Sequence, residues 1–463
     1  MFHYFDVHKD RRRPLRKYKG RARLSAISLL VLTSVLAASA QDLTKLPIDK
    51  NDPKSVAILS SAKPRAANQT KRVVTLADTV DIFLQQNLQL VAGRYDISAA
   101  EADRLTARLR PNPQVSFAAT DFPLAFSLQA FNPPTLDYSV SQTFETAGKR
   151  QKRTEVADAA IQVAQAQFEM TVWQLTNDVK KKFYAVLLAR SLYDLAKENQ
   201  STFAEIVEHT RDVFKLGEIS GLDLQRLEVE KIKFDTDLAN SERDYEVALR
   251  DLRLALGGNY PSTELEVAGS MEYYQSYDFS FDDLREKALA ARPDLKVAKL
   301  TEKVADASIR LQNAMKIPDV TLTGGIEQVK NDVSTYNIGV SIPLPVYDRN
   351  QGERAKALID KQRAQNQQQQ VTNQIIGDVD KALAAFNIQK RRLDLYKTGV
   401  LTKVTDIQTK TEISLKAGES STLELLDAIR TRRDTLAGFY QTIFDYQSSL
   451  LDLELATATP ILK

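Results

Sequence analysis

Apolar residues recur at intervals of three and four along one long stretch of this chain, which is the spacing of a packed helix face. They are Phe168, Val172, Leu175, Val179, Phe183 and Val186. No glycine or proline occurs between Gly148 and Gly217, so the pattern predicts one helix of nearly seventy residues. At 1.5 Å per residue, such a helix spans on the order of 100 Å. The segment 222–256 is also free of glycine and proline, and we expect it to return as a second long helix. A compact domain needs no helix of this length, so the pattern predicts an elongated, mainly helical protein.

Four short segments have the other period, with apolar and polar residues in alternation, which is typical of strands. We place them at about residues 114–121, 136–144, 319–327 and 335–343. Their apolar positions include Val115, Phe117, Ala119, Tyr138, Val140, Phe144, Val320, Leu322, Ile326, Tyr336, Ile338, Val340 and Ile342. One apolar face and one polar face suit the wall of an outer-membrane barrel, although a hairpin on a soluble core has the same alternation.

Four strands are too few for a closed barrel, because bacterial barrels begin at about eight. An open sheet edge cannot lie in lipid, where each unpaired backbone group costs several kcal/mol. If these strands lie in a membrane, copies of the chain must therefore join to close the sheet. Three copies of four strands would give twelve.

The pattern of helices and strands occurs twice along the chain. A shift of 205 residues takes Pro113 and Val115 to Pro318 and Val320, and a shift of 201 takes Lys215–Glu218 to Lys416–Glu419. Each copy is predicted as helix, two strands, long helix, tight turn and helix. The second copy has three glycines at which its helices could bend or break, namely Gly377, Gly399 and Gly438. We expect an extended segment at 41–74, a first repeat at 75–257, a connector at 258–280, a second repeat at 281–457 and a tail at 458–463.

The first forty residues have the features of a secretory signal peptide. A basic segment precedes the apolar run Leu24–Leu36, and Ala38-Ser39-Ala40 is a small-residue cleavage signature that predicts a mature N-terminus at Gln41. Residues 1–40 carry nine Lys/Arg and two Asp/Glu, so they contribute +7 to a total of +3, and the remainder carries −4. The basic character of the chain therefore belongs to its leader, and no nucleic-acid partner is expected.

The residue types that carry most enzyme chemistry are scarce in this chain. It has no cysteine, which excludes disulfides, thiolate metal ligands and a cysteine nucleophile. Beyond the leader its only histidine is His209, which has no candidate partner of the kind that catalysis or zinc binding requires. We therefore predict no catalytic, cofactor or metal site, and a protein that is not an enzyme.

From about residue 75 to residue 457 the chain resembles the TolC family of outer-membrane efflux channels. The resemblance rests on the duplicated helix-strand-strand-helix order and on the motifs Pro111-Asn112-Pro113, Ile317-Pro318, Ile342-Pro343-Leu344-Pro345, Leu216-Gly217-Glu218 and Ala417-Gly418-Glu419. It implies a homotrimer in which each chain contributes four strands to a twelve-stranded transmembrane β-barrel above a long α-helical barrel. Gly148-Lys149-Arg150 and Pro343-Leu344-Pro345 bring the chain closer to the heavy-metal efflux branch.

The resemblance also implies where the protein works and with what. It would be a passive exit duct in the outer membrane of a Gram-negative bacterium, in contact with lipid and extending into the periplasm. Its partners would be a periplasmic adaptor (a membrane fusion protein) and an inner-membrane pump of the RND type, in a tripartite efflux or type I secretion system. The hairpin tips would dock the adaptor through Leu216, Gly217, Glu218, Ala417, Gly418 and Glu419.

Two acidic residues fall on the positions that ring the periplasmic constriction in this family, Glu424 and Asp427. They are three residues apart, so they lie on one helix face, and a trimer would place six carboxylates around its axis. A second interpretation is local: Ser421 and Glu424 have the spacing of a helix capping box, and Ser220 and Asp223 repeat it in the first copy. The cap does not need Asp427, so a gating role is better supported there than at Glu424.

Two other classes of exported protein share part of this pattern. A periplasmic adaptor is also rich in coiled coil, but it needs a β-rich domain between its hairpin arms, and this chain has only short strand pairs. An exported coiled-coil structural protein would explain the helices and leave the duplicated amphipathic strands unexplained.

Overall fold

The computed structural model describes residues 72–120, 135–217, 219–258, 265–271, 276–329, 333–417 and 419–461. The predicted signal peptide and nearly all of the predicted extended segment lie outside these residues. The described residues fall within one compact unit, Thr70–Lys463. Its helices are α3 (Leu76–Gln86), α4 (Leu88–Arg108), α5 (Lys149–Lys215), α6 (Gly221–Ala255), α7 (Phe281–Ala291), α8 (Pro293–Met315), α9 (Gln351–Tyr396), α10 (Val400–Lys416) and α11 (Thr422–Thr457).

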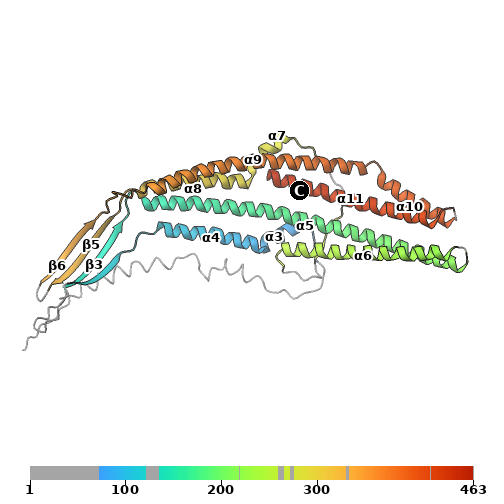
Figure 1. The fold of residues 1–463 in the computed structure, drawn as a ribbon, viewed down its shortest axis with the longest axis horizontal. Coiled ribbons are helices and arrows are strands. Elements are labelled where there is room, and N and C mark those ends of the chain that lie inside the picture. Colours follow the sequence, from blue (N-terminus) through green and yellow to red (C-terminus); the bar gives the residue numbers. More distant parts are fainter. Residues whose placement is uncertain are drawn as a thin grey trace, which may run out of the picture. The chain divides into compact units, whose positions relative to one another are not determined.

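Long helices make up most of this unit (Figure 1). Helix α5 has 67 residues, and its predicted apolar face includes the buried residues Val179, Phe183 and Val186. It packs against α4, α6, α8 and α11. Each copy leads from a helix into two strands and returns through a long helix, a turn and another helix, so the predicted mainly helical, duplicated fold is confirmed.

One of the three glycines proposed as kinks or joints in the second copy interrupts a helix. Gly399 has a φ of 77° and separates α9 from α10, whereas Gly377 and Gly438 lie within α9 and α11. Gly438 has a packing role instead: a Cβ there would lie 2.9 Å from the hydroxyl of Tyr396. The second copy therefore divides into α9 and α10 what the first copy forms as a single helix.

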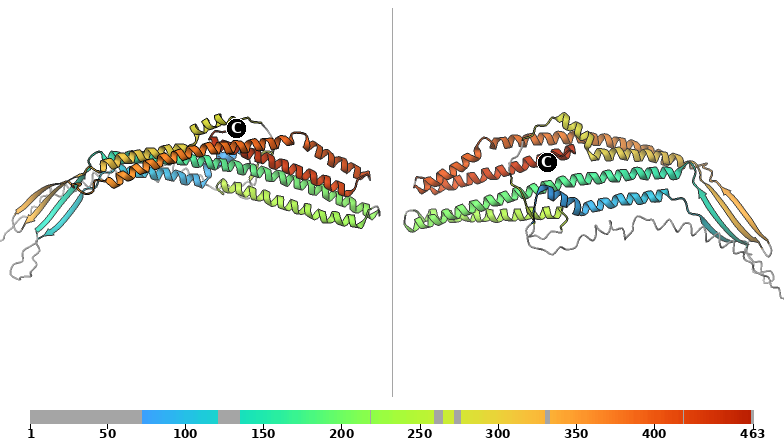
Figure 2. Two further views of the ribbon diagram at one scale, coloured as in Figure 1. Left: turned by 45° about the horizontal axis from the view of Figure 1, so that its top comes forward. Right: turned by 180° about the vertical axis from the view of Figure 1, so that it is seen from behind.

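Four strands form one antiparallel sheet in the order β2 (Gln114–Thr120), β3 (Thr135–Phe144), β5 (Val320–Val329) and β6 (Val333–Ser341). Its register aligns the predicted apolar positions across the sheet, for example Val115 with Val140 and Leu322 with Val340. The sheet lies at one end of the helices, and the α5–α6 and α10–α11 turns lie at the other (Figures 1 and 2).

A second, smaller sheet was not predicted. Strand β1 (Arg72–Val74) pairs in parallel with β4 (Leu265–Val267), which lies inside the predicted connector. Each strand has three residues, too few for an alternating pattern to be recognised. Val74, Leu265 and Val267 are buried in the larger hydrophobic core, which surrounds the middle of α5.

No helix among the described residues combines the length and the apolar character that crossing a membrane requires.

Candidate functional site

The first predicted tip is the turn between α5 and α6. Leu216 is 75% exposed, and Gly217 follows with a φ of 80°, a conformation that favours glycine. Its N–H donates to the Phe214 carbonyl (2.9 Å) and so closes the last turn of α5. Glu218, the third residue of this predicted tip, lies outside the described residues.

The second predicted tip is the turn between α10 and α11. Ala417 and Glu419 are both exposed, whereas Gly418 lies outside the described residues. The Ala417 N–H donates to the Ile413 carbonyl (3.0 Å), and the Glu419 N–H donates to the Ser414 carbonyl (2.9 Å). Both turns thus present short, exposed segments at the end of the helices farthest from the four-stranded sheet (Figure 1).

The two predicted gate residues lie in the first turns of α11, immediately after the second tip. The Ser421 N–H donates to Glu424 Oε2 (3.1 Å), and the Glu424 N–H donates to Ser421 Oγ (3.3 Å). Glu424 therefore does cap the helix, as its local interpretation requires. Asp427 is exposed and has no hydrogen-bond or ion-pair partner within the described part of the chain. The cap therefore accounts for Glu424 and leaves Asp427 without a local structural role.

The equivalent capping box predicted in the first copy forms only in half. Ser220 Oγ accepts from the Leu222 N–H (3.2 Å), but Asp223 makes no reciprocal bond to the Ser220 backbone. The Asp223 carboxylate lies 3.5 Å from the Arg226 guanidinium instead. A cation one turn further along the helix thus competes with the cap, so the prediction for Ser220 and Asp223 was wrong in this part.

A small hydrophobic cluster lies beneath the two predicted gate residues and fixes the face of α11 on which they stand. Its members are Phe203 and Val207 of α5, Leu227 and Phe234 of α6, and Leu425, Leu426 and Ile429 of α11. The rings of Phe203 and Phe234 stack with their centroids 4.5 Å apart. Because Leu425, Leu426 and Ile429 point into this cluster, Glu424 and Asp427 are left on the opposite, exposed face of α11.

Polar contacts above this cluster connect α11 to the first hairpin. We name Arg430, Arg432 and Arg433 of α11 the arginine cluster. Arg430 pairs with the buried Glu230 of α6, Arg433 with Asp237 of α6 (3.0 Å), and Arg432 with Glu198 of α5 (2.8 Å). These contacts were not predicted from the sequence, although three arginines in four residues, immediately after the acidic pair, were a visible signal.

Glu230 is the most buried acceptor of these contacts. Burial alone would raise the pKa of its carboxyl. Hydrogen bonds from Arg430 and Lys233 outweigh burial and hold the pKa below its ordinary value. Glu230 is therefore charged at neutral pH, and it connects one helix of each hairpin.

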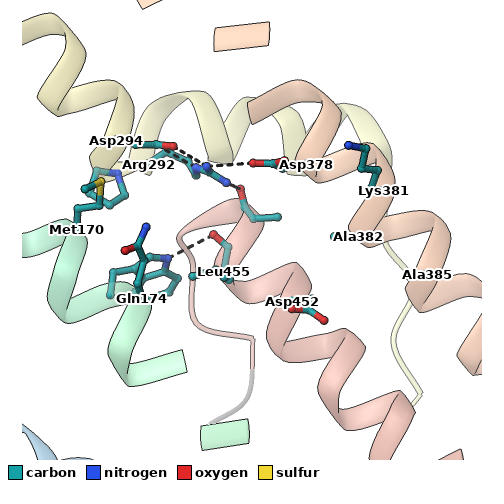
Figure 3. Close-up of a pocket in the computed structure, with 13 residues that line it drawn as sticks. Met170, Gln174, Arg292, Asp294, Asp378, Lys381, Ala382, Ala385, Asp452 and Leu455 are labelled. Carbon is teal, nitrogen blue, oxygen red and sulfur yellow. Dashed lines mark hydrogen bonds and ion pairs between the residues drawn. The ribbon is translucent and has the colours of Figure 1, made fainter. Parts of the chain in front are cut away.

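The unit also contains a pocket of about 500 Å³ between α5, α8, α9 and α11 (Figure 3). Its most buried charge belongs to Arg292, which pairs with Asp294 (2.5 Å) and Asp378 (3.3 Å) and donates to the Ala456 carbonyl (3.2 Å). Trp173 donates to the neighbouring Leu455 carbonyl (3.3 Å). These groups satisfy one another and fasten the end of α11 to α8 and α9, which is a structural role.

No group of three or more His, Asp or Glu side chains suited to a metal ion occurs within the described residues.

Comparison with known proteins identifies this arrangement. A family model described as outer membrane efflux protein matches residues 79–258 and 284–459. The cobalt-zinc-cadmium resistance protein CzcC of Cupriavidus metallidurans is 23% identical over 77% of this chain and 84% of its own length. Outer membrane protein TolC of Vibrio cholerae is 23% identical over 66% of this chain and 72% of its own.

The fold also matches solved channels. The structure of the Campylobacter jejuni CmeC outer membrane channel superposes with a TM-score of 0.70, at 16% identity, over 82% of this chain and 85% of CmeC. At this identity the likeness concerns the fold, and the family match covers both repeats of the chain.

Proposed function

Because this chain belongs to the outer membrane efflux protein family, we propose that three copies of it close one barrel and form a gated conduit. Members of the family are exit ducts of efflux systems, and the chain shares this function and its place in the outer membrane, extending into the periplasm. Family members form trimeric channels that work with adaptors and inner-membrane pumps. The observation that carries the trimer is the four-stranded sheet, with one apolar face and two edges that pair with no other described strand.

The apolar face of the sheet is suited to lipid. Ile338 is 88% exposed and Tyr336 is 82% exposed, and both stand on this face of β6. Strands β2 and β6 form the two edges, and neither has a neighbour on its outer side among the described strands. Open edges cannot remain in hydrocarbon, so β6 of one copy must pair with β2 of the next, and three copies give twelve strands.

The other face of the sheet is suited to water. Asp137 of β3 stands directly opposite Glu327 of β5, and Thr335 of β6 follows in the same row. Two carboxylates opposite each other repel, and this arrangement is tolerable where water and cations screen them. We assign this face to the lumen of the barrel.

The helices then continue the conduit into the periplasm and end at the two exposed tips. We assign docking of the periplasmic adaptor to these tips, and the narrowest passage to the first turns of α11. There a trimer would bring together six carboxylates from Glu424 and Asp427, which would attract cations and exclude anions. Glu424 would serve both as a cap and as a gate residue, and Asp427 as a gate residue alone.

The arginine cluster would hold this passage in its narrow state. Arg430 and Arg433 connect α11 to α6, so the second hairpin cannot swing outward without breaking these pairs. Opening by the adaptor and the pump would therefore act against charge-assisted contacts of about 1.5–3 kcal/mol each, less where water reaches them.

The cargo class we propose is divalent heavy-metal ions, exported by a pump of the RND type. The name of the relative CzcC refers to cobalt, zinc and cadmium, and the chain carries Gly148-Lys149-Arg150 and Pro343-Leu344-Pro345. The duct itself has no cysteine to retain a soft metal, so selection would rest with the pump. A type I secretion partner is the alternative.

Mass measurement of the protein extracted from outer membranes in mild detergent tests the trimer. We expect a complex of three chains that dissociates on heating and conducts ions in planar bilayers. A monomer without conductance would refute the proposal. Recovery from the inner membrane would favour an adaptor, and recovery in the soluble fraction would favour a coiled-coil structural protein.

A further inference from the structure

The strands of the two repeats pair in equivalent registers. A shift of 205 residues takes Gln114 of β2 to Asp319 before β5, and a shift of 202 takes Gly148 before α5 to Asn350 before α9. Gly148 and Asn350 are the N-cap residues of α5 and α9, and both have the left-handed backbone conformation, with φ of 66° and 58°. A shift of 205 for the first strand and of 202 for the second converts the β2–β3 pairing into the β5–β6 pairing. Residues that stand opposite each other in one hairpin therefore correspond to residues that stand opposite each other in the other. The equivalence therefore holds for the strands as well as for the helices.

Within the chain, the exit from copy one meets the entry to copy two. Phe144, the last residue of β3, stands opposite Val320, the first residue of β5. The Thr146 N–H donates to Asp319 Oδ1 (2.9 Å), and the buried Lys149 ammonium lies 2.7 Å from the same oxygen. This joint between the two repeats is thus fully paired.

The other exit and the other entry are uncovered in a single chain. Residues 341–349, which leave β6, are all exposed, and Leu344 and Tyr347 reach 79% and 93%. Residues 108–120, which enter and form β2, are also exposed throughout. The residues equivalent to those of the joint within the chain are therefore exposed to solvent in a single chain.

We propose that the same joint forms between neighbouring copies in the trimer, and that it fixes the register of the barrel seam. Shifting the pair Phe144–Val320 places Val346 of one copy opposite Val115 of the next. Leu344 then stands opposite Phe117, and Ile342 opposite Ala119. This inference rests on the trimer proposed above, and its partner is a second copy of this chain.

The faces of the two strands agree with this register. Ile342, Leu344 and Val346 continue the apolar face of β6, on which Ile338 and Val340 stand, and their partners belong to the apolar face of β2. A slip of one residue would put apolar side chains opposite polar ones. The two shifts were derived without reference to polarity, and they still place apolar residues opposite apolar residues.

The prolines in the segment agree as well. Pro343 and Pro345 lack an N–H and alternate with the three paired residues. All N–H groups that this segment donates to β2 must therefore belong to Ile342, Leu344 and Val346, which the alternation of an antiparallel strand allows. In the single chain the Val346 N–H donates to the Leu344 carbonyl (2.9 Å), and pairing would replace this bond.

Engineered disulfides test the register, because the chain has no cysteine of its own. Directly opposite residues of an antiparallel pair are about 4.5–5.5 Å apart at Cα, within the reach of a disulfide. We expect L344C combined with F117C to give covalent dimers and trimers on a non-reducing gel. L344C combined with V115C or A119C, each displaced by two residues on the same face, should give markedly less.

Two further pairs serve as controls. F144C with V320C should close within the chain and give no ladder, and I342C with A119C should give the same ladder as the first pair without removing Phe117. A trimer by mass that cross-links best in a displaced pair would overturn the register and leave the trimer standing. So would a trimer without any ladder when F144C–V320C forms. A monomer by mass would refute the proposed function, and this inference with it.

Discussion

Glu230→Gln is the substitution that best tests whether contacts between the hairpins hold the conduit narrow. Glu230 is buried on α6 and accepts from Arg430 of α11 and from Lys233 (2.8 Å). Glutamine keeps the size and one acceptor oxygen, but it removes the negative charge that pairs with both cations and replaces the second acceptor with an NH₂ group that cannot accept. A hydrogen bond to a charged group contributes about 1.5–3 kcal/mol. Since Arg430 remains 39% exposed and can turn to water, we expect a net loss of about 1–2 kcal/mol.

Single-channel recording in planar bilayers measures this loss. A change of about 1–2 kcal/mol in the narrow state corresponds to a factor of about 5–30 in the ratio of closed to open channels. The matched control is Glu228→Gln. Glu228 is a half-exposed acceptor of Arg211 (2.8 Å), and this pair lies within the first hairpin. We expect the control to leave gating unchanged.

Acidification should act on the same contact. Because the pKa of Glu230 lies below its ordinary value, the pairing is complete above the pKa of an unfolded glutamate and is lost as the pH falls through the folded value. The wild-type channel should therefore open more often in acid, and Glu230→Gln should have lost that part of the response. Equal gating in Glu230→Gln and Glu228→Gln would contradict the reasoning, as would a Glu230→Gln channel that closes more tightly.

Three further experiments test other parts of the structure. Ile338→Lys on the apolar face of β6, which we assign to lipid, should destabilise the proposed trimer by about 2–4 kcal/mol, measured by heat dissociation on a gel, whereas Asn337→Lys on the polar face should assemble normally. Glu424→Gln with Asp427→Asn should abolish cation preference in bilayers at unchanged thermal stability, because glutamine also serves in the cap, and wild-type selectivity would exclude the gating role. Gly217→Ala should lower thermal stability by about 1–2 kcal/mol through backbone strain alone, since no atom lies within 4 Å of the added Cβ; an unchanged melting temperature would contradict this.

The sequence predicts most of the fold because its strongest signals are local and long. The absence of glycine and proline before Gly217, together with apolar residues at helical spacing, predicts α5 without any knowledge of the helices that pack against it. Alternation likewise foretold the strands around Val115 and Ile338. The three-residue strands β1 and β4 escaped prediction because only their mutual pairing, across almost two hundred residues, makes them strands.

Side-chain pairing was harder to predict than the elements that carry it. The cap at Glu424 was visible because its partner, Ser421, is three residues away. The pair of Arg430 with Glu230 joins residues two hundred positions apart, and each arginine on a charged helix has many candidate acceptors. The wrong prediction at Ser220 has the same cause, because the spacing of residues along the chain does not show which of several neighbouring groups a carboxylate such as that of Asp223 will contact.

The joint within the chain and the proposed joint between copies differ in chemistry, and from this difference we infer an order for the steps of assembly. Inside the chain, the buried Lys149 pairs with Asp319, and breaking a buried pair by removing one partner costs about 3–5 kcal/mol. In the proposed joint between copies, the same shifts replace Lys149 with Gln351 and Asp319 with Gln114. Both residues are uncharged, so the single chain needs no partner for a buried charge at this joint. The joint within the chain can therefore form during folding, while the exposed ends stay tolerable in water. Only in lipid do unpaired edges become costly, so for the proposed trimer we expect closure of the sheet and entry into the membrane to occur together.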